Sequence, residues 1–202
     1  MIVKQIKQLI PKATSPKQAE LIISATKLFH RYGFGKVSVE ELCRHAKVSK
    51  VTFYRYYKGK DELILQILRL LFDDVSARVR EVLDSEIDLK LKFDRVAMIK
   101  QEFTRVLGDE IVGALFSYHG IQEYFRELSR QSMEDFKTFL YREQASGRIN
   151  PKLNIEMLLV LMGGINSMIA EHKMEAIGAN YAELVAQINE ILVYGLFSRE
   201  EA

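Results

Sequence analysis

Prolines leave the long middle of this chain uninterrupted. The 202 residues contain only three, Pro11, Pro16 and Pro151, so no proline breaks a helix between residues 17 and 150. Glycines fall where helices are expected to end, at Gly33, Gly59, Gly108, Gly120, Gly147 and Gly178. We find no alternating strand pattern and no internal repeat. The sequence therefore predicts an all-α protein of about nine helices.

Charge is divided sharply at Lys60. Residues 1–60 carry thirteen Lys or Arg against three acidic residues, a net charge of +10, and residues 61–202 carry a net charge of −8. Such asymmetry is typical of a polyanion-binding module joined to a domain of another kind. DNA is the first polyanion to consider, because neutralising its phosphates releases counterions. A basic segment that docks on an acidic protein is the alternative at this point.

Composition excludes several other classes of protein. An apolar content of 48% with 28% charged residues is typical of a globular chain. The single cysteine, Cys43, excludes an internal disulfide framework and a Cys-based zinc finger. The N-terminus lacks the apolar core of a secretory signal, and the apolar run from Met157 is too short to span a membrane. We therefore expect a soluble, cytoplasmic protein without a membrane partner.

The basic segment shows the start signals of three short helices. Ser15 is a good N-cap, with Pro16 at the first helical position and Gln18 completing a capping box, and the helix should close at Gly33. The expected buried face of this helix consists of Leu21, Ile22, Ala25, Leu28, Phe29 and Tyr32.

Two further helices follow, separated by a tight turn. Ser38 begins one of them, with Glu41 at the capping-box position, and Ser49 begins the next. The turn between them is the short sequence AKVS. Two short helices joined in this way form a helix-turn-helix, whose second helix can enter the major groove of DNA.

The second of these helices lies in the segment VSKVTFYRYYKGK, residues 48–60, which combines four aromatic with four basic residues. Phe53 and Tyr57 are four positions apart and should point inward. The outward side and the N-terminal end would then consist of Lys50, Val51, Thr52, Tyr54 and Arg55, and the hydroxyls of Tyr54 and Tyr56 could contact the DNA backbone. This distribution predicts a nucleic-acid face.

Residues 18–64 resemble the DNA-binding domain of the tetracycline-repressor (TetR) family of transcriptional regulators. The resemblance rests on AELIISATKLFHRYGFGKVSVEELCRHAKVS followed by TFYRYYKGKDEL. The turn, the Thr-Phe-Tyr step, the pair Tyr56-Tyr57 and the run from Lys60 to Leu63 all occur in register. The family's turn glycine is Lys47 here, and Val51 replaces its usual small residue, so the operator sequence need not follow that of other members.

The resemblance implies a role for individual residues of this domain. Phosphate contacts are implied for Ser38, Ser49, Tyr54, Tyr56 and Lys60, although Tyr56 could simply pack. Base contacts are implied for Lys50, Val51, Thr52 and Arg55. Residues 1–14, with Lys4, Lys7 and Lys12, would form an N-terminal arm over the DNA backbone, together with Lys17, or a frayed terminus. The DNA-binding domain would comprise residues 1–60.

Residues 61–202 continue the helical pattern. We expect helices over about 61–84, 90–107, 109–117 and 120–146, then one from the cap Asn154 and one at the C-terminus. The helix after Asn154 is apolar almost all round, as is typical of a helix buried on two sides.

The same resemblance implies that residues 61–202 form a helical ligand-binding and dimerisation domain. The last two long helices would pair with their copies as a four-helix bundle. The expected interface consists of Gly163, Leu184, Ile188, Ile191 and Leu192. Two heads would then bind successive major-groove faces of a palindromic operator. The implied function is a ligand-responsive dimeric repressor, released from DNA by a small-molecule effector. The alternative is a helical DNA-binding dimer without an effector.

The residues that suit an effector pocket are aromatic, sulfur-containing or imidazole side chains outside the DNA head. They are Phe103, Phe116, Tyr118, His119, Phe125, Met162 and His172. Such residues at helical spacing also form ordinary cores. His119 and His172 have no Cys partner nearby, so we expect no metal and no cofactor. No Glu-x-x-His pair, phosphate-binding glycine loop or nucleophile elbow occurs, and we expect no enzyme.

Overall fold

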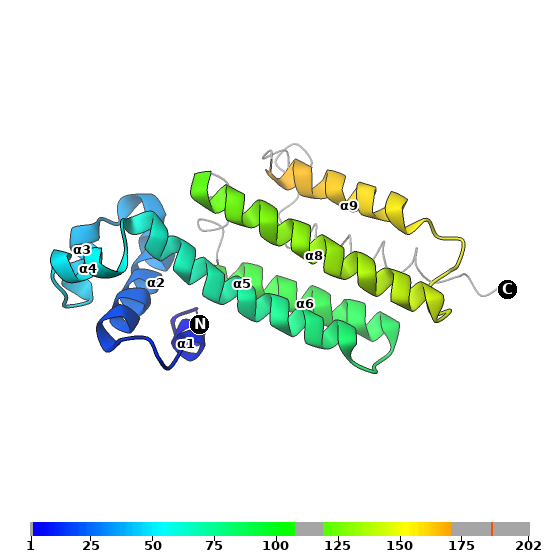
Figure 1. The fold of residues 1–202 in the computed structure, drawn as a ribbon, viewed down its shortest axis with the longest axis horizontal. Helices are drawn as coiled ribbons and strands as arrows, with labels where there is room; N and C mark the ends of the chain where they lie inside the picture. Colours follow the sequence, from blue (N-terminus) through cyan, green and yellow to red (C-terminus); the bar gives the residue numbers. More distant parts are fainter. Residues whose placement is uncertain (1, 108–118, 171–186, 188–202) are drawn as a thin grey trace. The chain divides into compact units, whose positions relative to one another are not determined.

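The computed structural model describes residues 2–107, 119–170 and 187, and these residues form helices joined by short connections (Figure 1). The helices are α1 (Ile2–Leu9), α2 (Pro16–Lys36), α3 (Val39–His45), α4 (Lys50–Tyr56), α5 (Lys60–Asp84), α6 (Leu89–Leu107), α8 (His119–Ala145) and α9 (Ile155–Ala170). The all-α expectation is confirmed. The helix expected over 109–117 and the C-terminal helix lie outside the described residues.

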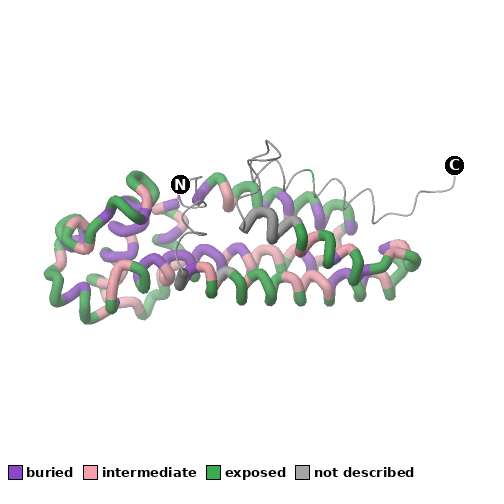
Figure 2. The backbone as a smooth tube through the Cα atoms, turned by 90° about the horizontal axis from the view of Figure 1, so that it is seen from above, coloured by how far each residue is buried: buried purple, intermediate pink, exposed green. Residues whose placement is uncertain are grey.

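The chain divides into two compact units. The first, called the head unit below, comprises Met1–Ala77 and Phe103–Tyr124, and the second, called the bundle unit, comprises Arg78–Glu102 and Phe125–Ala202. Figure 2 shows buried and exposed segments alternating along the helices, as expected of amphipathic helices. Among the described helices, none is long and apolar enough to cross a membrane.

Helix α2 begins and bends at the residues that the sequence indicates. The Ser15 hydroxyl accepts a hydrogen bond from the Gln18 backbone N–H at 3.3 Å, and Pro16 occupies the first helical turn. Gly33 leaves the helical conformation with a φ of 77°, which glycine adopts without steric cost, and one further turn runs to Lys36.

One residue of the expected buried face of α2 is misplaced. Leu21, Ile22, Ala25, Leu28 and Phe29 are buried, but Tyr32 is 44% exposed, with the Arg31 guanidinium 5.2 Å from its ring centre. The left-handed turn at Gly33 redirects the chain. Phe34 consequently takes the inner position, with its ring edge-to-face against Phe29 at 5.2 Å.

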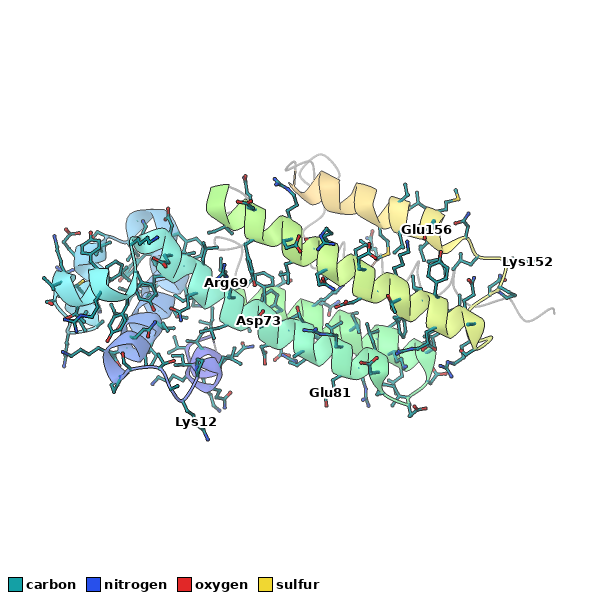
Figure 3. All side chains as sticks on the ribbon, viewed as in Figure 1. Lys12, Arg69, Asp73, Glu81, Lys152 and Glu156 are labelled. Atoms are coloured by element: carbon teal, nitrogen blue, oxygen red, sulfur yellow. The ribbon has the colours of Figure 1, made fainter. Side chains whose placement is uncertain are left out.

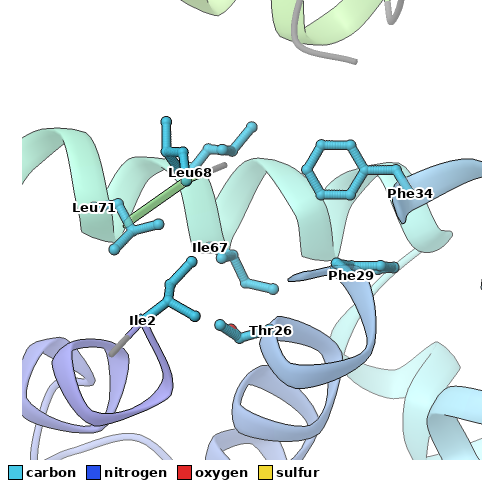
Figure 4. A pocket seen from close by; sticks show the side chains of 8 residues that line it. Ile2, Thr26, Phe29, Phe34, Ile67, Leu68 and Leu71 are labelled. Atoms are coloured by element: carbon cyan, nitrogen blue, oxygen red, sulfur yellow. The ribbon is translucent and has the colours of Figure 1, made fainter. Parts of the chain in front are cut away.

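The N-terminal residues form a packed helix rather than a frayed terminus. Ile2 and Ile6 of α1 are buried, and the Gln5 side chain donates a hydrogen bond to Asp74 of α5 at 3.1 Å. A small apolar pocket lies between α1, α2 and α5, lined by residues such as Ile2, Phe29 and Ile67 (Figure 4). The lysines Lys4, Lys7 and Lys12 remain exposed, and Lys12 projects from the connection between α1 and α2 (Figure 3).

The bundle unit has its own apolar core, to which α6, α8 and α9 contribute. The buried members are Leu83, Leu89, Phe93, Phe139, Leu140, Ile149, Ile155 and Leu159. Helix α9 begins as expected, because the Asn154 side chain accepts a hydrogen bond from the Met157 backbone N–H at 3.0 Å. Among the described residues of α9, Ile155 and Leu159 are buried, whereas Met157, Val160 and Leu161 are 64%, 74% and 59% exposed.

A buried carboxylate lies where α8 ends. Glu143 is 1% exposed, and its charge is shared by Lys92 at 3.7 Å, Arg142 at 3.6 Å and a closer contact with Arg148. Lys92 and Arg142 also donate hydrogen bonds to the Leu83 backbone carbonyl, each at 2.8 Å. This cluster ties the end of α5 to α6, α8 and the segment after α8.

Candidate nucleic-acid interface

Helices α3 and α4 form the helix-turn-helix that the sequence predicts, and both contact α2. The Ser38 hydroxyl accepts a hydrogen bond from the Glu41 backbone N–H at 3.3 Å, and the Glu41 carboxylate accepts one from the Ser38 backbone N–H at 2.9 Å. This is the complete capping box. At the start of α4, the Ser49 hydroxyl accepts a hydrogen bond from the Thr52 backbone N–H at 3.1 Å.

The turn between α3 and α4 contains a strained lysine. Lys47 has a φ of 53°, in the left-handed region that favours glycine. The Val48 N–H donates to the Cys43 carbonyl at 3.0 Å and so closes the turn. The turn thus keeps the left-handed conformation although a lysine stands where the family has glycine.

The inner side of α4 anchors the helix. Phe53 is fully buried and Tyr57 is 3% exposed, with their ring centroids 5.6 Å apart, as the sequence predicts. The Tyr57 hydroxyl donates a hydrogen bond to the Gln66 side chain of α5 at 2.5 Å. Burial raises the pKa of Tyr57 to about 12, so this hydroxyl stays neutral and remains a donor.

The outer side of α4 is open to solvent. Val51 is 73% exposed, Tyr54 is 55% exposed, and Arg55 is also exposed. Lys50, the first residue of the helix, forms an ion pair with Glu40 of α3. Their hydrogen bond raises the pKa of Lys50 and lowers the pKa of Glu40, so both groups are charged at neutral pH. An exposed face with apolar, hydroxyl and cationic groups suits the edges of base pairs.

Thr52 does not belong to this outer side, so its expected outward placement is wrong. The residue is 9% exposed, and its hydroxyl lies 3.0 Å from the Ser49 hydroxyl. The physical reason is the helix cap. Thr52 donates its backbone N–H to the Ser49 hydroxyl, and its own side chain turns toward the same hydroxyl.

Tyr56 and Lys60 make internal contacts with partners that the sequence did not indicate. The Tyr56 hydroxyl accepts a hydrogen bond from the Ser15 hydroxyl at 2.8 Å. The Lys60 ammonium donates to the backbone carbonyls of Phe34 at 2.7 Å and Val37 at 3.0 Å. An ammonium has three N–H donors, so these two bonds leave one for a phosphate. No local pattern could reveal partners that lie more than twenty residues away along the chain.

Few of the residues expected in an effector pocket fall in the described part of the chain. Phe103 is half-buried in the head unit, with its ring centre 4.7 Å from that of Phe72. Met162 packs against the core of the bundle unit, as an ordinary core residue would. Phe116, Tyr118 and His172, and the side chains of His119 and Phe125, lie outside the described residues.

Most of the expected dimer interface also lies outside the described residues. This applies to Leu184, Ile188, Ile191 and Leu192, whereas Gly163 lies in α9 and is half-buried.

An aromatic cluster in the head unit extends beyond Phe103. The Tyr124 ring lies 6.3 Å from Phe72, and the Arg69 guanidinium lies 5.4 Å from the Tyr124 ring centre. The pKa of Tyr124 is raised to about 12, chiefly by burial and also by the charge of Asp73, whereas Arg69 acts in the opposite direction. Arg69 and Asp73 are one turn apart on α5 (Figure 3).

Within residues 2–107, 119–170 and 187, no three His, Cys, Asp or Glu residues are placed to hold a metal ion.

Comparison with known families decides what this helix-turn-helix belongs to. Residues 21–67 match the family model described as bacterial regulatory proteins, tetR family, and this range contains α3, α4 and most of α2. Over residues 21–67 the chain is similar to the tetR family. The resemblance noted from the sequence is thereby confirmed, and the family is described as one of bacterial regulatory proteins.

Individual relatives extend this comparison. The HTH-type transcriptional regulator YuxN of Bacillus subtilis is 33% identical over 66 residues, which are 33% of this chain and 23% of YuxN. The chain therefore spans about a quarter of the length of that relative. The fatty acid metabolism regulator protein of B. subtilis is 21% identical, and the alignment covers 93% of this chain and all of that protein.

Solved structures share the fold over nearly the whole chain. The fatty acid degradation regulator FadR of Bacillus halodurans has a TM-score of 0.65 at 15% identity, covering 93% of this chain and 100% of that one. FadR of B. subtilis, solved in complex with stearoyl-CoA, has a TM-score of 0.62 at 18% identity, covering 88% and 98%. At such identities the likeness concerns the fold alone.

Proposed function

We propose that this protein is a tetR-family, ligand-responsive repressor that binds a palindromic DNA operator as a homodimer and leaves it when a small-molecule effector binds. Residues 1–60 would bind DNA, and residues 61–202 would bind the effector and the second subunit. The observation that supports this proposal most is the exposed outer side of α4. The buried Phe53 and Tyr57 hold the inner side of the helix in place, so the outer side is presented to DNA in a fixed orientation. Such a regulator would act in the cytoplasm, where the chromosome of a bacterium lies.

The proposed DNA contacts divide into two kinds. Lys50, Val51 and Arg55 would contact base edges, with the cations favouring guanine and Val51 favouring a thymine methyl group. The backbone contacts would come from Ser38, Ser49, Tyr54, Tyr56 and Lys60. The net charge of +10 on residues 1–60 would supply the sequence-independent part of the affinity.

The proposed dimer is supported by the outer side of α9. Met157, Val160 and Leu161 follow at steps of three and four residues, so they share one face of the helix, and each is more than half exposed. A contiguous exposed apolar face is typical of a surface that another protein covers. A two-fold dimer would place two copies of α4 at successive major-groove faces of the operator.

The effector class that we propose first is a long-chain acyl thioester of coenzyme A. The support is twofold: the B. subtilis FadR structure contains stearoyl-CoA and shares this fold, and a fatty acid metabolism regulator aligns over nearly the whole chain. The head unit offers suitable chemistry in its half-buried rings Phe103 and Tyr124, with the Arg69 cation beside them. An acyl chain would fit apolar rings and a phosphate would fit a guanidinium.

Binding of a selected operator in the presence of acyl compounds tests this function. Fluorescence anisotropy of labelled operator is measured with stearoyl-CoA, octanoyl-CoA, free stearate or coenzyme A alone, and melting temperature is recorded in parallel. Stearoyl-CoA should raise the melting temperature and weaken operator binding together, as thermodynamic linkage requires. Compounds that stabilise the protein and never change DNA affinity would instead favour a DNA-binding dimer without an effector.

A further inference from the structure

We propose that Glu40 is a specificity-determining residue of the DNA interface and that it acts through Lys50. This inference rests on the proposed function, because it assigns a new role at the face of α4. Glu40 lies in the first turn of α3 and Lys50 is the first residue of α4, so their contact joins the two helices of the helix-turn-helix. Nothing in the sequence pattern assigned Glu40 a role at the interface.

The placement of Glu40 needs a functional explanation. Residues 1–60 contain only three acidic side chains. Glu41 completes the cap of α3, and Glu20 accepts a hydrogen bond from Ser24 at 3.5 Å, within the same helix. Glu40 is the one of the three whose carboxylate contacts a proposed base-contacting residue.

Stability is a poor reason for the Glu40–Lys50 pair. The two side chains are 60% and 55% exposed, and ion pairs between exposed groups contribute little to folding. The dipole of α3 favours an acidic residue in its first turn, but Glu41 already fills that role. Neither explanation accounts for the contact with Lys50.

The pair has a direct consequence for DNA binding. A lysine without an acidic partner would neutralise a phosphate on any sequence and release a counterion. The Glu40 carboxylate neutralises most of the charge that Lys50 would present to the DNA backbone, and it also repels nearby phosphates. A guanine presents two acceptors, O6 and N7, at fixed positions, and the Lys50 N–H groups that do not bond to Glu40 can donate hydrogen bonds to them. Glu40 thus lowers the affinity for random DNA more than the affinity for the operator.

The first test uses Glu40→Gln, which removes the charge and keeps the shape. Affinities of the full chain for the selected operator and for a random duplex are measured at four salt concentrations. The variant should bind random DNA about 3- to 10-fold more tightly, with a salt slope steeper by about one ion, and should gain less on the operator. Its melting temperature should equal that of the wild type. Equal gains on both DNAs, or no gain on either, would overturn the proposal.

A double-mutant cycle shows whether Glu40 acts through Lys50. The effect of Glu40→Gln on salt slope and discrimination should disappear in the Lys50→Met background. An unchanged effect in that background would mean that Glu40 acts as a bulk charge, and the proposal would be wrong. Glu102→Gln is the matched control, because Glu102 pairs with Arg78 in the bundle unit, and it should change neither quantity.

The inference and the proposed function can fail separately. If Lys50→Met leaves discrimination intact while Arg55→Ala removes it, Lys50 does not contact bases and the role of Glu40 falls, but the proposed function stands. If the chain discriminates no DNA sequence in any variant, the proposed function falls first.

Discussion

At the scale of single residues, the proposed DNA contacts of Arg55 and Lys60 are of two different kinds. Arg55 is exposed on α4, where a guanidinium can bond to guanine O6 and N7. Arg55→Ala should therefore cost about 1–3 kcal/mol of discrimination at one symmetric pair of operator positions. Affinities for a panel of single-base operator variants at two salt concentrations measure this. A uniform loss across the panel would make Arg55 a backbone contact instead.

Lys60 should behave differently because it has an internal role. Its ammonium bonds to the carbonyls of Phe34 and Val37, so Lys60→Ala leaves two acceptors without their donor. We expect a loss of about 1–3 kcal/mol in unfolding free energy, together with weaker binding to every DNA sequence. Urea unfolding and anisotropy measure the two effects. The exposed Lys58→Ala is the control and should unfold like the wild type; an equally stable Lys60→Ala would refute the internal role.

Sequence patterns predicted correctly the placement of only those residues whose contacts are with near neighbours in the chain. The inward Phe53 and Tyr57 and the caps Ser38 and Ser49 follow from helical spacing and from residues three or four positions away. Thr52 was misplaced because helical spacing alone does not show how a cap orients the next turn. The bonds of Lys60 depend on tertiary structure, and no spacing within the sequence could have indicated them.

At the scale of elements, Glu143 joins the helices of the bundle unit. Burial alone would raise the pKa of Glu143, but the Arg148 hydrogen bond and the charges of Lys92, Arg148 and Arg142 outweigh it and lower the pKa. The stability that Glu143 contributes is therefore complete above its ordinary pKa of 4.5 and is lost as the pH falls through the lowered value.

Glu143→Gln should remove this contribution at neutral pH. The nearly buried Lys92 would lose its counter-charge, so we expect a loss of about 3 kcal/mol in unfolding free energy at pH 7. Urea unfolding between pH 3 and 7 measures it, and the variant should lose less stability than the wild type below about pH 4.5. The exposed Glu127→Gln serves as the control. Identical pH profiles for wild type and Glu143→Gln would contradict the role of this cluster.

Element boundaries were largely predictable, because caps and glycines mark them in the sequence. The start of α2 at Pro16 and the start of α9 after Asn154 were both predicted. The packing of α1 was not, since the partners of its buried residues Ile2 and Ile6 lie on distant parts of the chain. Gly33 was expected to end α2, but its φ of 77° redirects the chain for one more turn, which moves Phe34 inside.

At the scale of the whole molecule, the proposed dimer needs the exposed face of α9. Val160→Glu would place a charge in that interface, and the protein should become monomeric at micromolar concentration with weakened operator binding. Sedimentation measures the mass of the free protein. Met98→Glu is the matched control, because Met98 of α6 is similarly exposed and should tolerate the charge without loss of the dimer. A Val160→Glu variant that remains dimeric would show that this face is not the interface.

Selection of bound sequences from a random pool of duplex DNA tests the central claim most directly. The claim is that two copies of α4 contact bases from a two-fold dimer. The full chain should enrich an inverted repeat whose half-sites are separated by about one helical turn or a multiple of it. Guanines should occur in each half-site at the positions that Lys50 or Arg55 can reach. Enrichment of no sequence, or of a single asymmetric site, would contradict the account.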